Sequence, residues 1–306
     1  MVSAIKTSGL TRRFGGQIAV DAVSMTVPEG AVYGFLGRNG SGKTTTIKML
    51  LGLLKPSSGS ALICGLDVAA ERRYAASRLG GLLEGHGFYK RMSGLENLRM
   101  AQRLRGVDAS EPARVLELVG MSSSAGKRVS DYSQGMRQRL GLARALLGAP
   151  PVLILDEPMN GLDPEGIAEM RQLLKALPDR AKTTVLISSH LLSEIEHTAT
   201  HIGILSGGRL VLEGELADLK SRFGVNVVLR VNDVVAASRA LHQYETIEKI
   251  GERKIVIQIR GRCPDKETLR IVEILNKSGC EIYEISQKQV SMGALFGRFA
   301  GSGYMS

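Results

Sequence analysis

No apolar run in the sequence is long enough to cross a membrane. A membrane-spanning helix needs about 18 consecutive apolar residues, whereas the longest apolar stretch, ALLGAPPVLIL at residues 145–155, is interrupted by two prolines. The first residues, MVSAIKTSGLTRRF, lack the apolar core of roughly 7–15 residues that a secretory signal peptide carries. We therefore expect a cytoplasmic chain, and any membrane role to come through a partner.

Cysteine is scarce, and a basic block is absent. The three cysteines, Cys64, Cys263 and Cys280, lie far apart without C-x-x-C spacing. This predicts reduced thiols and argues against a cysteine metal site. The net charge of +10 is spread along the chain, without the mixture of basic and aromatic residues typical of nucleic-acid grooves, so we expect no nucleic-acid partner. The excess is either solvated surface charge or an attraction to an anionic membrane.

The chain has the composition of a globular protein: 43% of its 306 residues are hydrophobic. Buried-type strands at 31–37, 152–155 and 184–188 are each followed by a loop and a helical pattern. This predicts an α/β fold with a mostly parallel sheet covered on both faces. Short β-rich runs fill residues 1–30, and residues 94–147 are expected to form a helical subdomain.

The composition changes near residues 223–224, which divides the chain into expected domains at 1–220 and 225–306. The second domain is predicted to have the order βαββαβ, which suggests a small α+β unit of ferredoxin-like type. The expected strands are 225–231, 246–250, 254–260 and 280–287, and the expected helices are 233–242 and 265–278.

A phosphate-binding loop is the clearest motif. GRNGSGKT at residues 37–44 matches G-x-x-x-x-G-K-[ST] and lies between a predicted strand and a predicted helix at 43–54, as this motif requires. Its backbone N–H groups would form a nest for ATP phosphates, Lys43 would reach the β- and γ-phosphates, and Thr44 would ligate Mg²⁺. The expected phosphate-binding residues are Gly37, Arg38, Asn39, Gly40, Ser41, Gly42, Lys43, Thr44 and Thr45.

Two further strand ends carry residues suited to ATP hydrolysis. In VLILDEP (152–158), Asp156 can hold Mg²⁺ and Glu157 can polarise the water that attacks the γ-phosphate. His190 follows the strand TVLISS and can donate a hydrogen bond to the γ-phosphate or the water. Taken alone, Asp-Glu after an apolar strand is more often a turn, and a histidine at a strand end is more often incidental. Together with the phosphate loop, the two features predict a site with Lys43, Glu157 and His190 as catalytic residues.

The segment DYSQGMRQRLGLARALL (131–147) offers a second phosphate-binding device. Ser133, Gln134 and Gly135 precede a basic amphipathic helix, whose N-terminus can bind an anion. The alternative is an ordinary helix cap at Ser133. One nucleotide has little need of two separate loops from one subunit, whereas a head-to-tail dimer that sandwiches two nucleotides requires both.

This arrangement resembles the ATP-binding subunits of ABC transporters over residues 1 to about 220. GRNGSGKT resembles the Walker A motif and VLILDE the Walker B motif. YSQGM resembles the signature, NGLD (160–163) the D-loop, and His190 the switch histidine. The signature departs from the commonest form at Tyr132, Gln134 and Met136 but keeps Ser133 and Gly135.

The resemblance implies roles for further residues. Ser133, Gly135 and Asp163 would contact nucleotide at the dimer interface, and Phe14, in RRFGG, would stack on adenine. Glu84, in GGLLEGHGFY, stands where the family has glutamine, and chains with glutamate there resemble bacitracin-type and lantibiotic self-protection exporters. We interpret Glu84 as a sensor that joins the nucleotide to the permease. A catalytic role, as an acceptor near Mg²⁺ or the water, and a solvated strand-end charge are the alternatives.

The resemblance thus implies an ATP-hydrolysing, Mg²⁺-dependent subunit of a bacterial ABC exporter. It would act as a homodimer on a separate integral-membrane permease, at the inner face of the membrane, to expel drugs or antimicrobial peptides. The alternative is a soluble ABC-type ATPase of translation or DNA repair. Translation factors usually carry two such domains, and repair ATPases place long coiled coils between the motifs, whereas only residues 45–132 lie there in this chain. A non-hydrolysing regulatory module is disfavoured because Lys43, Asp156, Glu157 and His190 occur together.

Overall fold

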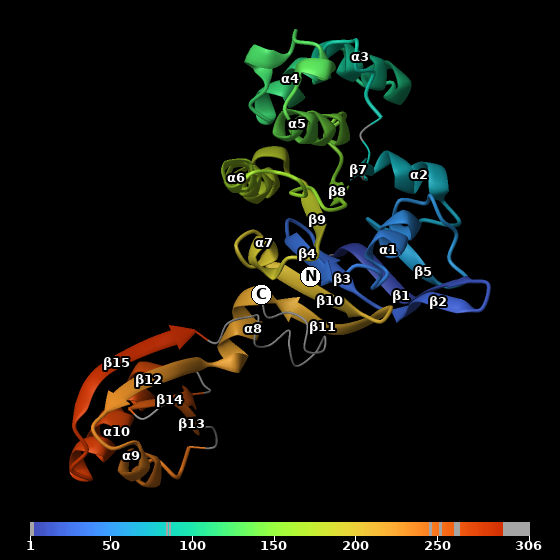
Figure 1. Cartoon of the computed structure of the whole chain (residues 1–306). Helices are drawn as coiled ribbons and strands as arrows, with labels where there is room; N and C mark the ends of the chain where they lie inside the picture. Colours follow the sequence, from blue (N-terminus) through green and yellow to red (C-terminus); the bar gives the residue numbers. More distant parts are fainter. Residues whose placement is uncertain are drawn as a thin grey trace. The chain divides into compact units, whose positions relative to one another are not determined.

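A computed structural model describes residues 3–83, 85, 87–244, 247–250, 253–259 and 264–289. The chain divides into two compact units, Met1–Gly214 and Glu215–Ser306, both drawn in Figure 1. Helix α8 (Leu216–Phe223) thereby belongs to the second unit, although most of it lies before the boundary expected from composition. No helix in the described ranges has the length and apolarity that membrane crossing requires.

The first unit is built on a six-stranded sheet in the order β11-β10-β4-β9-β8-β7. Its five strands from β10 to β7 run parallel, and every residue of β4, β8 and β9 is buried. Strands covered on both faces need continuous apolar runs, so the predicted mostly parallel sheet is confirmed. The strands are β4 (Val32–Gly37), β7 (Leu79–Leu82), β8 (Val152–Leu155), β9 (Thr184–Ser189), β10 (His201–Ser206) and β11 (Arg209–Glu215).

A second, antiparallel sheet comes from the N-terminal part of the chain. Its order is β2-β1-β5-β6, with β3 paired to β1. One hydrophobic core joins side chains of this sheet, of α1 and of β4, among them Ile5, Met49 and Phe35. The strands are β1 (Ser3–Phe14), β2 (Gln17–Val23), β3 (Thr26–Pro28), β5 (Ser58–Ile63) and β6 (Leu66–Asp67).

Helices complete this unit. The predicted helical subdomain contains α3 (Gly94–Arg105), α4 (Glu111–Leu118), α5 (Gln134–Ala145) and short 3-10 turns at Ser122–Ser124 and Val129–Asp131. Helix α3 begins with a capping box in which Ser93 and Glu96 bond each other's backbone N–H, a device that satisfies two otherwise unpaired donors. The remaining helices are α1 (Lys43–Leu50), α2 (Arg72–Ser77), α6 (Pro164–Ala181) and α7 (Leu192–Glu196).

Helix α1 is shorter than the sequence predicted. The expected helix spans residues 43–54, but α1 ends at Leu50. Gly52 takes a left-handed φ of 68°, its N–H bonds Met49 O, and the N–H of Leu53 bonds Lys48 O. This pair of bonds closes a helix C-terminus in a Schellman motif, so the apolar residues after Gly52 leave the helix.

The second unit has the predicted βαββαβ order. Its four strands form an antiparallel sheet in the order β13-β14-β12-β15, around a separate small core that includes Leu229, Ile257 and Ile271. The elements are β12 (Val225–Val231), α9 (Val234–Ala240), β13 (Ile247–Ile250), β14 (Lys254–Ile259), α10 (Pro264–Lys277) and β15 (Ile282–Gln289). Each bound lies within two residues of the expected one, and the differences of two residues are at the end of α9 and at both ends of β15.

Close packing of β4 against α7 yields a prediction for stability. A Cβ at Gly34 would lie 2.2 Å from Ile195 Cγ2, closer than van der Waals contact allows. Overpacking of this kind costs about 1–3 kcal/mol, so Gly34→Ala should lower the free energy of unfolding by that amount in urea titrations followed by circular dichroism. Gly16→Ala, whose Cβ would meet nothing within 4 Å, is the control. Equal stability of the two variants would contradict this packing.

Candidate nucleotide-binding and catalytic site

The predicted site residues follow three neighbouring strands. Strand β4 leads into the phosphate loop, β8 into Asp156 and Glu157, and β9 into His190. The sheet order places β9 between β4 and β8, and all three run parallel. Their carboxyl ends therefore meet at one edge of the sheet, which is where open α/β sheets bind ligands.

The phosphate loop depends on its glycines. Gly40 and Gly42 have φ angles of 80° and 104°, a left-handed conformation that side chains disfavour. A Cβ on Gly42 would also lie 2.5 Å from Ala19 O in β2. Helix α1 begins immediately after Gly42, so the loop sits at a helix N-terminus, a position suited to anions.

Lys43 is directed back over this loop. Its Nζ donates to Gly37 O at 2.7 Å and to Arg38 O at 3.3 Å. The same Nζ lies 3.4 Å from Glu157 Oε1. The ammonium group is thus held between the mouth of the loop and the carboxylate that follows β8.

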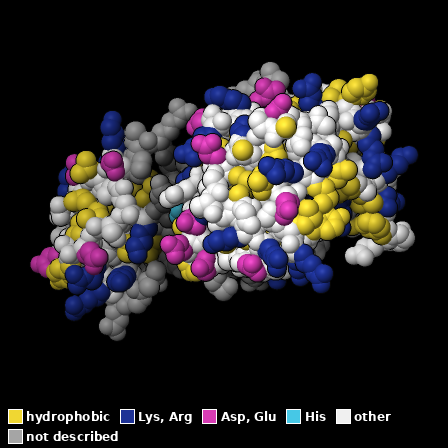
Figure 2. Space-filling model, turned by 90° about the horizontal axis from the view of Figure 1, so that it is seen from above, with side chains coloured by type: hydrophobic (Ala, Val, Ile, Leu, Met, Phe, Trp, Pro, Cys, Tyr) yellow, Lys and Arg dark blue, Asp and Glu magenta, His cyan; other side chains and the backbone are white. Residues whose placement is uncertain are grey.

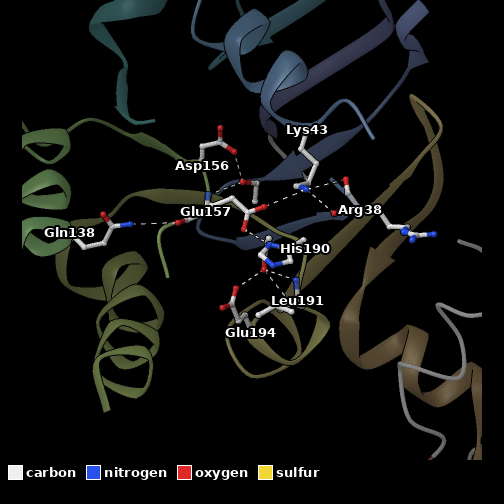
Figure 3. A network of polar contacts seen from close by, with 11 residues as sticks. Arg38, Lys43, Gln138, Asp156, Glu157, His190, Leu191 and Glu194 are labelled. Atoms are coloured by element: carbon white, nitrogen blue, oxygen red, sulfur yellow. Dashed lines mark hydrogen bonds and ion pairs between the residues drawn. The ribbon is translucent and has the colours of Figure 1, made fainter. Parts of the chain in front are cut away.

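Glu157 joins the three strand ends. Its second carboxylate oxygen, Oε2, lies 2.9 Å from His190 Nδ1, so this one side chain contacts both Lys43 and His190, as Figure 3 shows. Its backbone has a φ of 50°. Non-glycine residues seldom adopt this left-handed conformation, and those that do cluster at functional sites.

Neighbouring residues that the sequence analysis did not single out support these groups. Ser188 Oγ donates to Asp156 Oδ1 at 2.6 Å. Ser189 Oγ donates to the carboxylate of Glu194 in α7. Burial raises the pKa of Glu194, the hydrogen bond from Ser189 lowers it, and the negative charge of Glu157 raises it further. The only sequence signal for this support is the pair of hydroxyl residues directly before His190.

A cleft of about 380 Å³ opens over the phosphate loop. It brings together Lys43, Thr44, Glu157 and His190, whereas Asp156 lies buried beside it. The other lining residues are Ala19, Arg38, Asn39, Gly40, Gly42, Thr45 and Asn160. Asn160, the first residue of the predicted D-loop NGLD, lies in this cleft and not in the one that contains Asp163.

A separate cleft of about 600 Å³ contains the signature and D-loop residues Ser133, Gly135 and Asp163. Ser133 caps α5 by accepting from Met136 N at 3.2 Å, and Asp163 caps α6 in the same way from Gly166 N. The capping alternative for Ser133 is therefore observed. The two clefts share no lining residue, so one chain does not bring its signature to its own phosphate loop.

Phe14 also lies outside the lining of the phosphate-loop cleft. It ends β1, and its partner strand β2 supplies Ala19 to that cleft. Phe14 is 48% exposed, and Arg12 Cζ lies 4.6 Å from the centroid of its ring. The guanidinium of Arg12 is in turn anchored to Lys55 O at 2.7 Å. Glu84 falls outside the described residues.

Comparison with known proteins identifies the family. The family model described as "ABC transporter" matches residues 20–160. The chain is 38% identical, over 99% of each chain, to the bacitracin transport ATP-binding protein BcrA of Bacillus licheniformis. The chain belongs to the ATP-binding proteins of ABC transporters. The predicted resemblance to the export branch is thereby confirmed.

Other relatives of this ABC ATP-binding protein belong to the same family. The daunorubicin/doxorubicin resistance ATP-binding protein DrrA of Streptomyces peucetius is 35% identical over 96% of this chain and 91% of its own. A solved structure of an ATP-binding subunit of an ABC transporter superposes with a TM-score of 0.63 at 28% identity, covering 72% of this chain and 93% of the other. A soluble ATPase of translation or DNA repair is not favoured by these relatives.

The contacts of Glu157 predict the effect of its neutralisation. Glu157→Gln keeps the size of the side chain but removes its ability to accept a proton. General-base catalysis contributes about 10²–10⁴ in rate, so phosphate release should fall at least 100-fold while the ATP affinity stays close to that of the wild type. The matched control is Glu117→Gln, on the exposed face of α4. Hydrolysis near the wild-type rate in Glu157→Gln would remove Glu157 from the role of base.

Proposed function

We propose that this chain hydrolyses ATP and thereby drives export through a separate integral-membrane permease. The observation that carries the proposal is the meeting of Lys43, Glu157 and His190 at one sheet edge, with the Glu157 carboxylate in contact with both other side chains. In hydrolysis, Lys43 binds the β- and γ-phosphate oxygens, Glu157 orients and polarises the attacking water, and His190 hydrogen-bonds the γ-phosphate.

The donor set fits Mg²⁺. Thr44 and Asp156 offer oxygen atoms, which this hard cation prefers, and Mg²⁺ in nucleotide sites binds few protein groups besides the phosphates. Thr44 and Asp156 would hold the ion, which when bound neutralises charge on the phosphates.

The adenine contact is proposed for Phe14. The hairpin β1–β2 runs from Ala19, beside the phosphate loop, to Phe14 at its tip. A ring that Arg12 covers on one face can stack a base on the other face, because an aromatic ring has two.

A second copy of the chain would complete the site. Ser133, Gly135 and Asp163 lie in their own cleft, away from the phosphate loop of the same chain. Met136 N donates to Ser133 Oγ, but the N–H groups of Gln134 and Gly135, at the start of α5, have no intrahelical acceptors and can bind the γ-phosphate of a nucleotide held by the other copy. The proposed working unit is therefore a head-to-tail homodimer with two nucleotides.

A third cleft is proposed for contact with the permease. It measures about 440 Å³ and contains Leu51, Leu53, Leu79 and Leu83, of which Leu53 is 58% exposed. Figure 2 shows hydrophobic side chains in groups among Lys and Arg side chains on the face of the first unit seen from above. A leucine-rich cleft that also contains Arg144 suits a short amphipathic helix of a partner, which would keep the subunit at the inner face of the cell membrane.

Drugs or antimicrobial peptides are the proposed cargo, on the strength of similarity to proteins named for bacitracin transport and for daunorubicin/doxorubicin resistance. The test is to purify the chain with its permease in lipid vesicles and measure ATP hydrolysis with and without such compounds. We expect a peptide antibiotic or an anthracycline to raise the rate. A rate that responds to no compound of either class would contradict the proposed cargo.

The same assay tests Glu84, which directly follows the last leucine of the third cleft, Leu83. If Glu84 couples the nucleotide to the permease, Glu84→Gln should leave basal hydrolysis within about two-fold of the wild type and change the stimulation by the permease. Glu117→Gln again serves as the control. Loss of all basal activity would instead place Glu84 in the chemistry.

A further inference from the structure

We propose that Ser188 is a positioning residue that sets both acidic groups of the hydrolysis site through one hydroxyl. The inference rests on the proposed ATP hydrolysis. Ser188 lies one residue before the end of β9 and is completely buried. Its Oγ donates to Asp156 Oδ1 at 2.6 Å and accepts from Glu157 N at 2.9 Å.

The bond to Glu157 N restrains a strained backbone. A left-handed φ on a non-glycine residue costs of the order of 1–3 kcal/mol and persists only where neighbouring groups fix it. At Glu157 the N–H is held by Ser188 Oγ, and the carbonyl accepts from Asn160 N at 3.1 Å. The direction of the Cα–Cβ bond is thereby set, and this direction sends the carboxylate between Lys43 and His190.

The bond to Asp156 restrains a side chain. A carboxylate has two oxygens, and the Ser188 hydroxyl engages one of them, which fixes the rotation of the group. Partners of this kind, which orient a ligand without touching the metal, typically change metal affinity or activity 10- to 100-fold when removed. Ser188 therefore acts on Asp156 and Glu157 together.

Ser189 cannot replace Ser188. Successive side chains of a strand point to opposite faces, and Ser189 Oγ bonds the Glu194 carboxylate and accepts from Leu191 N at 2.9 Å. Ser189 thus shapes the turn that carries His190, whereas Ser188 serves the end of β8. The two adjacent hydroxyls have separate partners and separate tasks.

The experiment compares Ser188→Ala with Ser188→Thr, which keeps the hydroxyl. At saturating Mg²⁺, Ser188→Ala should lower kcat per folded chain at least ten-fold. The Kd for ATP, measured with a fluorescent analogue, should change less than about two-fold, because the substitution leaves the phosphate loop intact. The Mg²⁺ concentration that half-saturates nucleotide binding should rise. Ser188→Thr should restore most of kcat.

Thr7→Val is the matched control. The buried Thr7 hydroxyl also makes two bonds, donating to Val23 O and accepting from Met25 N, but it lies in the antiparallel sheet. The Thr7→Val variant should be less stable than the wild type but should keep its kcat per folded chain. Wild-type kcat in Ser188→Ala, an equal kcat loss in Thr7→Val, or a Kd that weakens in step with kcat would overturn the inference.

Glu157→Gln, assayed in parallel, separates this inference from the proposed function. If Glu157→Gln is inactive and Ser188→Ala is normal, only the role of Ser188 fails. If both hydrolyse ATP normally, the proposed chemistry of the site fails as well.

Discussion

The site depends on one interaction, the contact of the Glu157 carboxylate with Lys43 on one side and His190 on the other. It exists only if three strands run parallel, lie side by side and end at the same level. The fully buried β4, β8 and β9 provide this alignment, because a one-residue slip would exchange the side chains that pack on the two covered faces of the sheet. Core packing is thus the means by which residues far apart in the sequence reach one another.

The predicted site residues are divided between two clefts. The phosphate loop, Glu157 and His190 open into one cleft, whereas the signature and Asp163 open into another. Helix α5 carries the signature at its N-terminus, and its far end reaches β7, where a Cβ on Gly80 would collide with Ala145 O. A movement of α5 relative to β7 would therefore disturb close packing, which offers a physical link between the signature and the segment that follows β7.

Much of the fold and the site can be predicted from the sequence because strong local rules apply. The spacing of the glycines in GRNGSGKT predicts a phosphate-binding loop. The apolar runs before Asp156 and His190 predict buried parallel strands. In the second unit, the sequence of strand-like and helix-like segments predicts the element order βαββαβ. Ser188 escaped notice because a serine in a buried strand has no periodic signature, and its partner Asp156 lies 32 residues away. The end of α1 was missed because Leu53 and Leu54 continue the apolar pattern beyond Gly52.

The most direct measurement concerns the completion of one site by two chains. Lys43→Ala disables the phosphate loop, and Ser133→Arg disables the signature, so each variant alone should hydrolyse almost no ATP. In an equal mixture of exchanging dimers, half pair unlike chains and each of these contains one intact site, so about a quarter of the wild-type rate is expected if the sites act independently. Exchange is verified with differently tagged copies. A mixture no more active than either variant alone, with exchange demonstrated, would contradict the account.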